Sequence, residues 1–392
     1  MAASVKALTG NKAAAVGAAL CKPDLIAAYP ITPQSSVVET MASMIADGEI
    51  DSMMVQVESE HSAMSVVQGA VMAGGRAFTA TSAQGLALMF EPYFRQSTLR
   101  LPMVMAIATR EMTSPETVWS GQQDAMSVRE AGWMQVFCEN NQEILDMIIQ
   151  GYRIAENEEV LLPINVCYDG FYLSHMTERV EVPDQKVVDD FVRKFELKHL
   201  AYDPKNPMSV DPLTSGALVM KFRESHLNAM QSALKVIEDI DKDFEKQFGR
   251  SYGGVIDTYL CDDAEIVLVT IGSHTGTARE AIDIARANGK KVGLLKVRFM
   301  RPFPVEKIKE VLKNKRGFAV IDRSVSFGWN AGPVYVEVKS ALGDLSEKKS
   351  SFSAIGGLGG ADITLQHVLD CIDKLSELSN EPAGQVDTIW LS

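Results

Sequence analysis

Short apolar runs alternate with segments of helical periodicity over the first part of the chain. Between the runs, apolar residues repeat at helical spacing in Lys12–Leu20, Ser35–Ala46, Ala63–Ala73, Gln84–Gln96 and Gln142–Glu156. The runs themselves are typical of buried strands, and they span Asp24–Ile31, Met53–Val57, Ala77–Ala80, Met103–Ala108 and Val160–Tyr168. This alternation predicts an α/β domain in which helices cover both faces of a doubly wound, mainly parallel sheet.

A second alternation follows a more polar stretch, residues 180–262, which contains a long amphipathic helix at Ser215–Gln247. The strands predicted in this second series are Glu265–Ile271, Val292–Val297, Gly317–Asp322 and Ser351–Ile355. The helices predicted between and after them are Ala278–Asn288, Val305–Asn314, Gly332–Leu342 and Ile363–Lys374. We therefore expect two α/β domains, residues 1–250 with a helical connector and residues 251–392.

Composition and charge exclude several classes of function. The net charge of −13 repels polyanions and argues against nucleic acid as a partner. No apolar stretch is long enough for a membrane span, and the N-terminal residues do not resemble a secretory signal, so we expect a cytoplasmic protein. The five cysteines are scattered without a C-x-x-C pair, so we expect no metal or iron–sulfur ligands in this chain.

The first predicted strand ends in a rigid turn, Tyr29-Pro30-Ile31-Thr32-Pro33. The prolines restrict the backbone around Thr32 and leave its hydroxyl free to donate or accept a hydrogen bond. An ordinary structural turn, with Thr32 as the N-cap of the next helix, would have the same pattern. Both interpretations stay open at this point.

The next predicted strand ends in two carboxylates, Glu58 and Glu60, followed by His61. Thiamine chemistry needs an acid that hydrogen-bonds the aminopyrimidine ring, because the resulting imino tautomer removes the proton from the thiazolium carbon. Glu60 is the better candidate for this acid and Glu58 the second. From the pattern alone, a carboxylate that caps the helix Ala63–Ala73 is the stronger interpretation.

Arg110 follows the strand Met103–Ala108 and could grip a substrate carboxylate through two parallel hydrogen bonds. A structural ion pair explains its position equally well. The polar loop that follows has the features of a segment covering a substrate, or of an ordinary surface loop, and its candidate lid residues are Trp119, Gln122, Gln123 and Asp124.

Two glycine-rich turns occur in the second domain, at residues 272–277 and 356–360. The first joins a strand to a helix N-terminus, where free backbone amides could hold an anion. Neither matches a complete dinucleotide or phosphate-loop motif, so plain turns are the preferred interpretation.

Several long segments, in order along the chain, resemble the alpha subunit of pyruvate:ferredoxin oxidoreductase and its relatives, the 2-oxoacid:acceptor oxidoreductases. The resemblance covers nearly the whole chain, and its specific segments are Tyr29–Pro33, Val57–Ala63, Phe78–Leu86, Phe248–Gly254 and Arg298–Pro304. It implies a thiamine-diphosphate-binding pyrimidine domain followed by a domain like the C-terminal domain of transketolase. It also implies that Glu60 contacts the pyrimidine nitrogen beside Tyr29 and Pro30, and that Thr32 and Arg110 contact the 2-oxoacid.

The resemblance further implies an enzyme that is active only as a complex. A beta subunit would supply the diphosphate and Mg²⁺ site and an iron–sulfur cluster, and gamma and ferredoxin-like delta subunits would carry electrons, with a flavin as a further option. The implied reaction is oxidative decarboxylation of a 2-oxoacid with coenzyme A to acyl-CoA and CO2, with ferredoxin or NAD as acceptor.

The chain departs from the pattern of typical pyruvate enzymes in two places. Trp119-Ser-Gly-Gln-Gln-Asp124 stands where Trp-Gly-Asp-His-Gln-Asp is typical, and Ala361 stands where an arginine is common. These departures leave open whether the substrate is pyruvate or a bulkier acid, such as the aromatic phenylglyoxylate. A non-redox thiamine enzyme of the transketolase type and a non-catalytic scaffold remain the alternatives.

Overall fold

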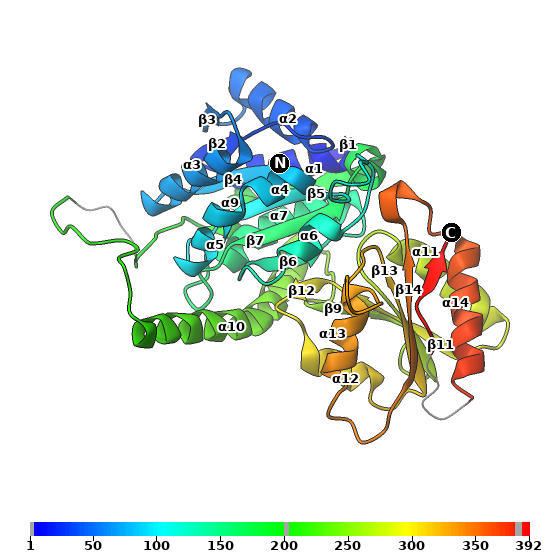
Figure 1. Ribbon diagram of the computed structural model, residues 1–392. Helices are drawn as coiled ribbons and strands as arrows, with labels where there is room; N and C mark the ends of the chain where they lie inside the picture. The colour runs from blue at the N-terminus through cyan, green and yellow to red at the C-terminus, as the bar shows by residue number, and fades with distance from the viewer. Residues whose placement is uncertain (1–3, 200–203, 381–385) are drawn as a thin grey trace.

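The first of two large sheets contains most of the strands of the N-terminal half (Figure 1). The computed structural model describes residues 4–199, 204–380 and 386–392. Neighbouring strands of this sheet are parallel except at the β12–β6 edge. Their order is β12 (Phe299–Arg301), β6 (Met134–Phe137), β7 (Ile164–Asp169), β5 (Val104–Thr109), β4 (Ala77–Thr81), β2 (Leu25–Ala28) and β3 (Met53–Gln56).

Helices cover both faces of this sheet because its central strands are apolar on both sides. Along β5, Ala106 and Ala108 belong to one buried cluster, whereas Met105 and Ile107 belong to another, as the two-residue period of a strand requires. The first cluster lies under α1 (Gly10–Leu20), α2 (Ser35–Ala46) and α7 (Asn141–Ala155). The second lies under α3 (Glu60–Met72), α4 (Ala83–Leu88), α5 (Phe90–Thr98) and α6 (Gln123–Ser127).

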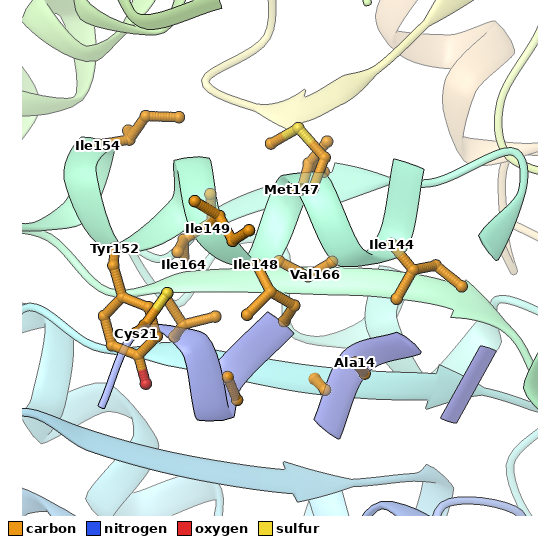
Figure 2. Packing of buried hydrophobic residues seen from close by; sticks show 14 of the residues in the cluster. Ala14, Cys21, Ile144, Met147, Ile148, Ile149, Tyr152, Ile154, Ile164 and Val166 are labelled. Atoms are coloured by element: carbon orange, nitrogen blue, oxygen red, sulfur yellow. The ribbon is translucent and has the colours of Figure 1, made fainter. Parts of the chain in front are cut away.

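Small residues on α1 allow it to pack tightly against α7. Figure 2 shows Ile144 and Ile148 of α7 close to Ala14 of α1, with Ile164 of β7 beside them. A Cβ atom added to Gly17 would lie 2.9 Å from the backbone oxygen of Leu145. The close approach of α1 to α7 therefore depends on a glycine at this position.

The second sheet is also mainly parallel, with the antiparallel strand β9 at one edge. Its order is β15 (Ile389–Leu391), β14 (Ser350–Gly356), β13 (Gly317–Asp322), β10 (Ile266–Thr270), β11 (Val292–Val297) and β9 (Ile256–Tyr259). One face packs against α11 (Thr275–Ala287) and α14 (Leu365–Leu378), and the other against α12 (Val305–Leu312) and α13 (Pro333–Ala341). The predicted α/β class with two mainly parallel sheets is confirmed.

The two halves of the chain share a core. Strand β12 follows β11 of the second sheet, yet it pairs with β6 of the first, where Phe299 is opposite Val136. Val269 and Leu295 of the second sheet also belong to the same buried cluster as Trp133 and Met105 of the first half. The division near residue 250 remains a proposal, because the two sheets that it separates share one buried apolar cluster.

Some elements differ from the sequence-based prediction. The helix expected at Gln84–Gln96 is two helices, because Met89 has non-helical backbone angles between α4 and α5. The stretch after β7 contains α8 (Tyr172–His175), β8 (Thr177–Val182) and α9 (Gln185–Val192), and β8 pairs antiparallel with β1 (Ser4–Thr9). The long helix α10 (Gly216–Phe248) then leads to the second half along the first sheet (Figure 1). Within the described residues, no helix is both long and apolar enough to cross a membrane.

Candidate active site

The structure brings Arg110 and Thr32 together at the carboxyl edge of the first sheet. Strands β2, β4 and β5 are parallel neighbours, so the residues that follow them meet at one edge. Arg110 Nη1 donates a hydrogen bond of 2.6 Å to the backbone oxygen of Thr32, and Nη2 donates one of 2.8 Å to Oε1 of Gln84. The two residues expected to contact the substrate are therefore direct neighbours.

Arg110 is buried, and its guanidinium group donates its two shortest hydrogen bonds to neutral acceptors. Its side chain is 5% exposed, and its Nε has no hydrogen-bond partner among the described residues. A carboxylate oxygen of Glu116 is 3.3 Å from Nη2, but Glu116 is itself largely exposed. A buried guanidinium in this situation retains the capacity to bind an added carboxylate.

Glu60 lies at the first position of α3, where Ser59 caps the helix by accepting a hydrogen bond of 3.2 Å from the backbone N–H of Ser62. The side chain of Ser59 thus performs the capping that the sequence pattern alone attributes to a carboxylate. Glu60 is only 5% exposed, and burial raises the pKa of its carboxyl group. Glu58, the second candidate, is exposed and accepts a hydrogen bond from Ser62, which lowers its pKa.

The surroundings of Glu60 suit a hydrogen bond to a ring nitrogen. A Cβ atom added to Gly85 would lie 2.5 Å from Glu60 Oε1 and 2.6 Å from Thr81 Oγ1, so the missing side chain leaves room for this carboxylate. Thr81 Oγ1 is buried and has no partner among the described residues. A buried carboxyl group beside an unpaired hydroxyl fits the recognition of an aminopyrimidine ring, which presents both donors and acceptors.

Tyr29 and Pro30 lie in the same loop as Thr32, with both side chains exposed at the rim. The buried side chain of Gln34 holds the loop by donating a hydrogen bond of 3.0 Å to the backbone oxygen of Tyr29. Both residues are therefore positioned to contact a group that approaches from outside the chain.

Of the four candidate lid residues, the structure exposes Trp119 and anchors the others. Trp119 is 52% exposed and packs on Phe171 with ring centroids 4.4 Å apart. Gln122 is buried, and Gln123 Oε1 accepts a hydrogen bond of 2.8 Å from Ser324 Oγ. Asp124 is fully buried and accepts hydrogen bonds from the backbone N–H groups of Ala83 and Arg110. Trp119 alone of the four is placed to cover a bound molecule.

A cavity of about 270 Å³ lies between the carboxyl ends of the two sheets. Trp119, Phe171 and Ile363 contribute apolar surface to it, and Ser273, His274 and Arg323 contribute polar surface. Both glycine-rich turns of the second half end here, since residues 273, 274 and 360 line the cavity. Of the positions that depart from the pyruvate-type pattern, Ser120 and Ala361 also line the cavity.

The floor of this cavity contains groups that sequence reasoning missed. Asp169, the last residue of β7, forms an ion pair of 2.7 Å with Arg323. Arg323 directly follows β13, so the rule that identified Arg110 would also have found it. Burial and the nearby Arg323 lower the pKa of His274 to about 4, which leaves its ring neutral. Among the described residues, no three His, Cys, Asp or Glu side chains converge in a way that could hold a metal ion.

Two family models match consecutive parts of the chain. Residues 16–242 match the thiamine-diphosphate-binding domain of pyruvate flavodoxin/ferredoxin oxidoreductases. Residues 264–368 match the core domain II of pyruvate:ferredoxin oxidoreductase. The residues described above at the edge of the first sheet lie within the thiamine-diphosphate-binding match.

Curated relatives resemble the chain over nearly its full length. It is 49% identical to the alpha subunit of an NADH-dependent phenylglyoxylate dehydrogenase from Aromatoleum evansii, over 98% of this chain and 94% of the relative. It is 44% identical to pyruvate synthase subunit PorA of Methanocaldococcus jannaschii, over 99% and 97%. A third relative, PorA of Pyrococcus abyssi, is 45% identical over 98% and 97%.

Solved structures share the fold. A 2-oxoglutarate:ferredoxin oxidoreductase from Magnetococcus marinus superposes with a TM-score of 0.74 at 20% identity, over 95% of this chain, and the present chain spans 65% of the length of that one. A split-gene transketolase in an inactive beta4 tetramer gives a TM-score of 0.52 at 12% identity, over 95% of this chain and 99% of that one. The family models and the curated relatives show that this chain belongs to the pyruvate:ferredoxin oxidoreductase family and is an alpha subunit of a 2-oxoacid oxidoreductase.

Proposed function

We propose that this chain holds the aminopyrimidine half of thiamine diphosphate and the carboxylate of a 2-oxoacid in one site. The observation that carries the proposal is the buried Glu60 carboxyl group beside Gly85, because the preceding residue of α4, Gln84, accepts a hydrogen bond from the buried Arg110. Glu60, an acid that can hold a proton, and Arg110, a cation that can bind a carboxylate, thus lie on either side of the start of α4. The reaction is oxidative decarboxylation of the 2-oxoacid with coenzyme A to acyl-CoA and CO2.

Each residue has a separate task in this reaction. Thiamine diphosphate, when bound, supplies the carbon nucleophile and the electron sink for decarboxylation. Glu60 holds a proton at its carboxyl oxygen against the pyrimidine nitrogen, and burial, which raises the pKa of this carboxyl group, favours its protonated form. Arg110 orients the substrate carboxylate, and Thr32 presents its hydroxyl in the loop that Arg110 grips.

The remaining parts of the reaction belong to partner subunits. A beta subunit provides the diphosphate and Mg²⁺ site and an iron–sulfur cluster, and gamma and delta subunits carry electrons to ferredoxin or, through a flavin, to NAD. The substrate is pyruvate or a bulkier aromatic 2-oxoacid. Relatives named as pyruvate synthase and as phenylglyoxylate dehydrogenase support both choices.

Replacing each of two neighbouring glutamates tests the role of Glu60. Glu60→Gln keeps the size of the side chain and removes its proton exchange, so acyl-CoA formation by the assembled complex should fall by about 10²–10⁴-fold. Glu58→Gln is the matched control, since Glu58 is exposed, and it should retain near-normal activity. Formation of acyl-CoA is followed with coenzyme A, a 2-oxoacid panel and a viologen dye. Normal turnover in Glu60→Gln would show that Glu60 is not the acid that acts on the pyrimidine ring.

A further inference from the structure

The cavity between the two sheets begins directly beside the proposed substrate-binding residues. Ser120, which lines the cavity, is paired with Arg110 through an antiparallel backbone bridge. On the other side, a Cβ atom added to Gly170, another lining residue, would lie 2.7 Å from Cγ of Pro33. Two residues that line the cavity therefore lie next to the Arg110–Thr32 pair: Ser120 beside Arg110, and Gly170 beside Pro33, the neighbour of Thr32.

The walls of the cavity are suited to a flat apolar group. The ring of Trp119 is tilted by 47° to that of Phe171, which in turn stacks on His175, and Ile363 adds an aliphatic surface. Aromatic rings pack favourably in such tilted and stacked arrangements. An engineered cavity of about 150 Å³ is known to hold benzene, so a cavity of about 270 Å³ has room for a six-membered ring.

The floor of the cavity is polar but nearly neutral. Arg323 is ion-paired with Asp169 at 2.7 Å, so its charge is already balanced and a second carboxylate from a ligand gains little there. Arg323 Nε and His274 Nδ1 are nevertheless without partners among the described residues, and both side chains are more than nine-tenths buried. His274 Nε2 lies 3.2 Å from the backbone oxygen of Ile321, so in the neutral ring Nε2 carries the proton and Nδ1 is an acceptor. An unpaired donor and an unpaired acceptor suit a hydroxyl group or a water molecule.

The rim is kept open by small residues. The backbone N–H of Gly360 donates a hydrogen bond of 2.8 Å to the backbone oxygen of Ser120, which fixes the turn 356–360 against the segment of Trp119. A Cβ atom on Gly360 would lie 2.8 Å from Cβ of Trp119. The next residue, Ala361, lines the cavity with only a methyl group, so a larger side chain there would narrow it.

We propose that this cavity binds the aromatic side chain of the 2-oxoacid, with Trp119 and Ala361 as residues that determine specificity. The proposal rests on the proposed function, because Arg110 must hold the carboxylate for the side chain to reach the cavity. An aryl 2-oxoacid is favoured over a dicarboxylic one, since the ring packs against Trp119 and Phe171 and the floor offers no free cation. A hydroxyl group on the ring, or an ordered water molecule behind it, is bound by Arg323 and His274.

The test compares substrates in the assembled complex. Wild-type complex should turn over phenylglyoxylate with a higher kcat/KM than 2-oxoglutarate. Ala361→Phe, which fills the rim, should lower kcat/KM for phenylglyoxylate at least 10-fold relative to pyruvate, because pockets discriminate by roughly 10–200-fold per small apolar group. Trp119→Ala, which removes one wall, should lower the same ratio. Trp329→Ala changes another exposed tryptophan outside the cavity and should leave the ratio unchanged.

The possible results separate this inference from the proposed function. If both cavity variants keep the wild-type ratio of phenylglyoxylate to pyruvate, or if wild type turns over pyruvate but no aryl acid, the inference is wrong and the proposed function stands. If wild-type complex oxidises no 2-oxoacid, the proposed function itself fails. Turnover of pyruvate by each variant shows that it has folded and assembled, and Ala361→Ser serves as a milder variant if Ala361→Phe does not assemble.

Discussion

Gly85 determines how much room the Glu60 carboxyl group has. An alanine at position 85 would place its Cβ atom 2.5 Å from Glu60 Oε1, so the carboxyl group would have to move. Helix α4 itself should tolerate the change, since alanine is favoured over glycine in helices by about 1 kcal/mol. Gly85→Ala should therefore lower acyl-CoA formation at least 10-fold without loss of folding. We would measure activity and thermal unfolding of the assembled complex.

Gly69→Ala provides the matched control for this prediction. Gly69 is in α3, the helix that carries Glu60, and an added Cβ atom there meets no atom within 4 Å. The variant should keep full activity and be slightly more stable. Equal activities of the Gly85 and Gly69 variants would show that the position of Glu60 does not matter for the reaction.

Arg110 offers a second prediction, because its planar guanidinium group donates hydrogen bonds to two acceptors from two separate nitrogens. Nη1 binds the backbone oxygen of Thr32 and Nη2 binds Gln84, and an ammonium group has no such planar fork. Arg110→Lys should raise KM for the 2-oxoacid at least 10-fold in steady-state kinetics of the complex. Arg95→Lys changes an exposed arginine paired with Asp211 and should leave KM unchanged. An unchanged KM in Arg110→Lys would reassign Arg110 to a structural role.

Some of the site residues that follow strands were predicted from the sequence, but Asp169 at the end of β7 and Arg323 directly after β13 were missed. Glu60 and Arg110 are polar residues just after apolar runs, and the sequence alone reveals this pattern. Phe171 was missed, and the turn that contains His274 was interpreted as a plain turn, because both residues become part of a cavity only when two sheets meet edge to edge. The burial of Gln122 and Asp124 could not be predicted either, because a polar segment of this kind resembles a surface loop in sequence.

The best predicted elements are fully buried strands with sharp ends. The expected bounds Val292–Val297 and Gly317–Asp322 are those of β11 and β13, because an uninterrupted apolar run flanked by polar residues has few alternatives. Strand β6 was missed since it is short and contains Gln135. The Gln135 side chain is satisfied by a hydrogen bond of 2.9 Å to the backbone oxygen of Ala125, a contact that local sequence does not reveal.

Helix α13 depends on a buried carboxylate at the end of β13. Asp322 accepts hydrogen bonds of 2.9 and 3.2 Å from the backbone N–H groups of Val334 and Tyr335, in the first turn of the helix. Burial raises the pKa of Asp322 to about 7, against the effect of these two donors. Between its ordinary pKa near 3.8 and about 7, the folded state keeps a proton that the unfolded chain releases. This group therefore makes the protein less stable as pH rises through that window.

Asp322→Asn should flatten this dependence on pH. The contribution of one such group is about 1.4 kcal/mol per pH unit at most, and the asparagine variant lacks it. The free energy of unfolding would be measured by denaturant titration at pH 4, 5.5 and 7 for wild type and variant. Asp51→Asn, at an exposed position, is the control. If the unfolding free energies of wild type and Asp322→Asn changed equally with pH, the raised pKa of Asp322 would be contradicted.

The two halves of the molecule are joined by a charged cluster as well as by the shared apolar core. Glu143 of α7 contacts Lys296 of β11 at 2.7 Å and Arg298 at 2.9 Å, and all three side chains are nearly inaccessible to solvent. Neither this cluster nor the pairing of β12 with β6 could be predicted from the sequence, because each joins residues more than 150 positions apart. The sequence predicts the two sheets, whereas their docking depends on contacts between distant segments.

Removing the carboxylate of this cluster should loosen the whole molecule. Burial alone would raise the pKa of Glu143, but Lys296 and Arg298 outweigh burial and lower it to about 2. Glu143→Gln leaves the buried Arg298 without its carboxylate partner and Lys296 with Glu139 alone, which costs about 3–5 kcal/mol. Denaturant unfolding of the full-length chain at pH 7 should show this loss. The control Asp239→Asn, in an exposed pair with Lys242, should change stability by less than about 1 kcal/mol.

The effect of Glu143→Gln should also depend on pH. Because the depressed pKa of Glu143 stabilises the folded state fully only above the ordinary pKa of the group, the difference in unfolding free energy between wild type and Glu143→Gln should shrink as pH falls from 4.5 toward 2. A constant difference over that range would mean that the cluster contributes through packing and not through charge.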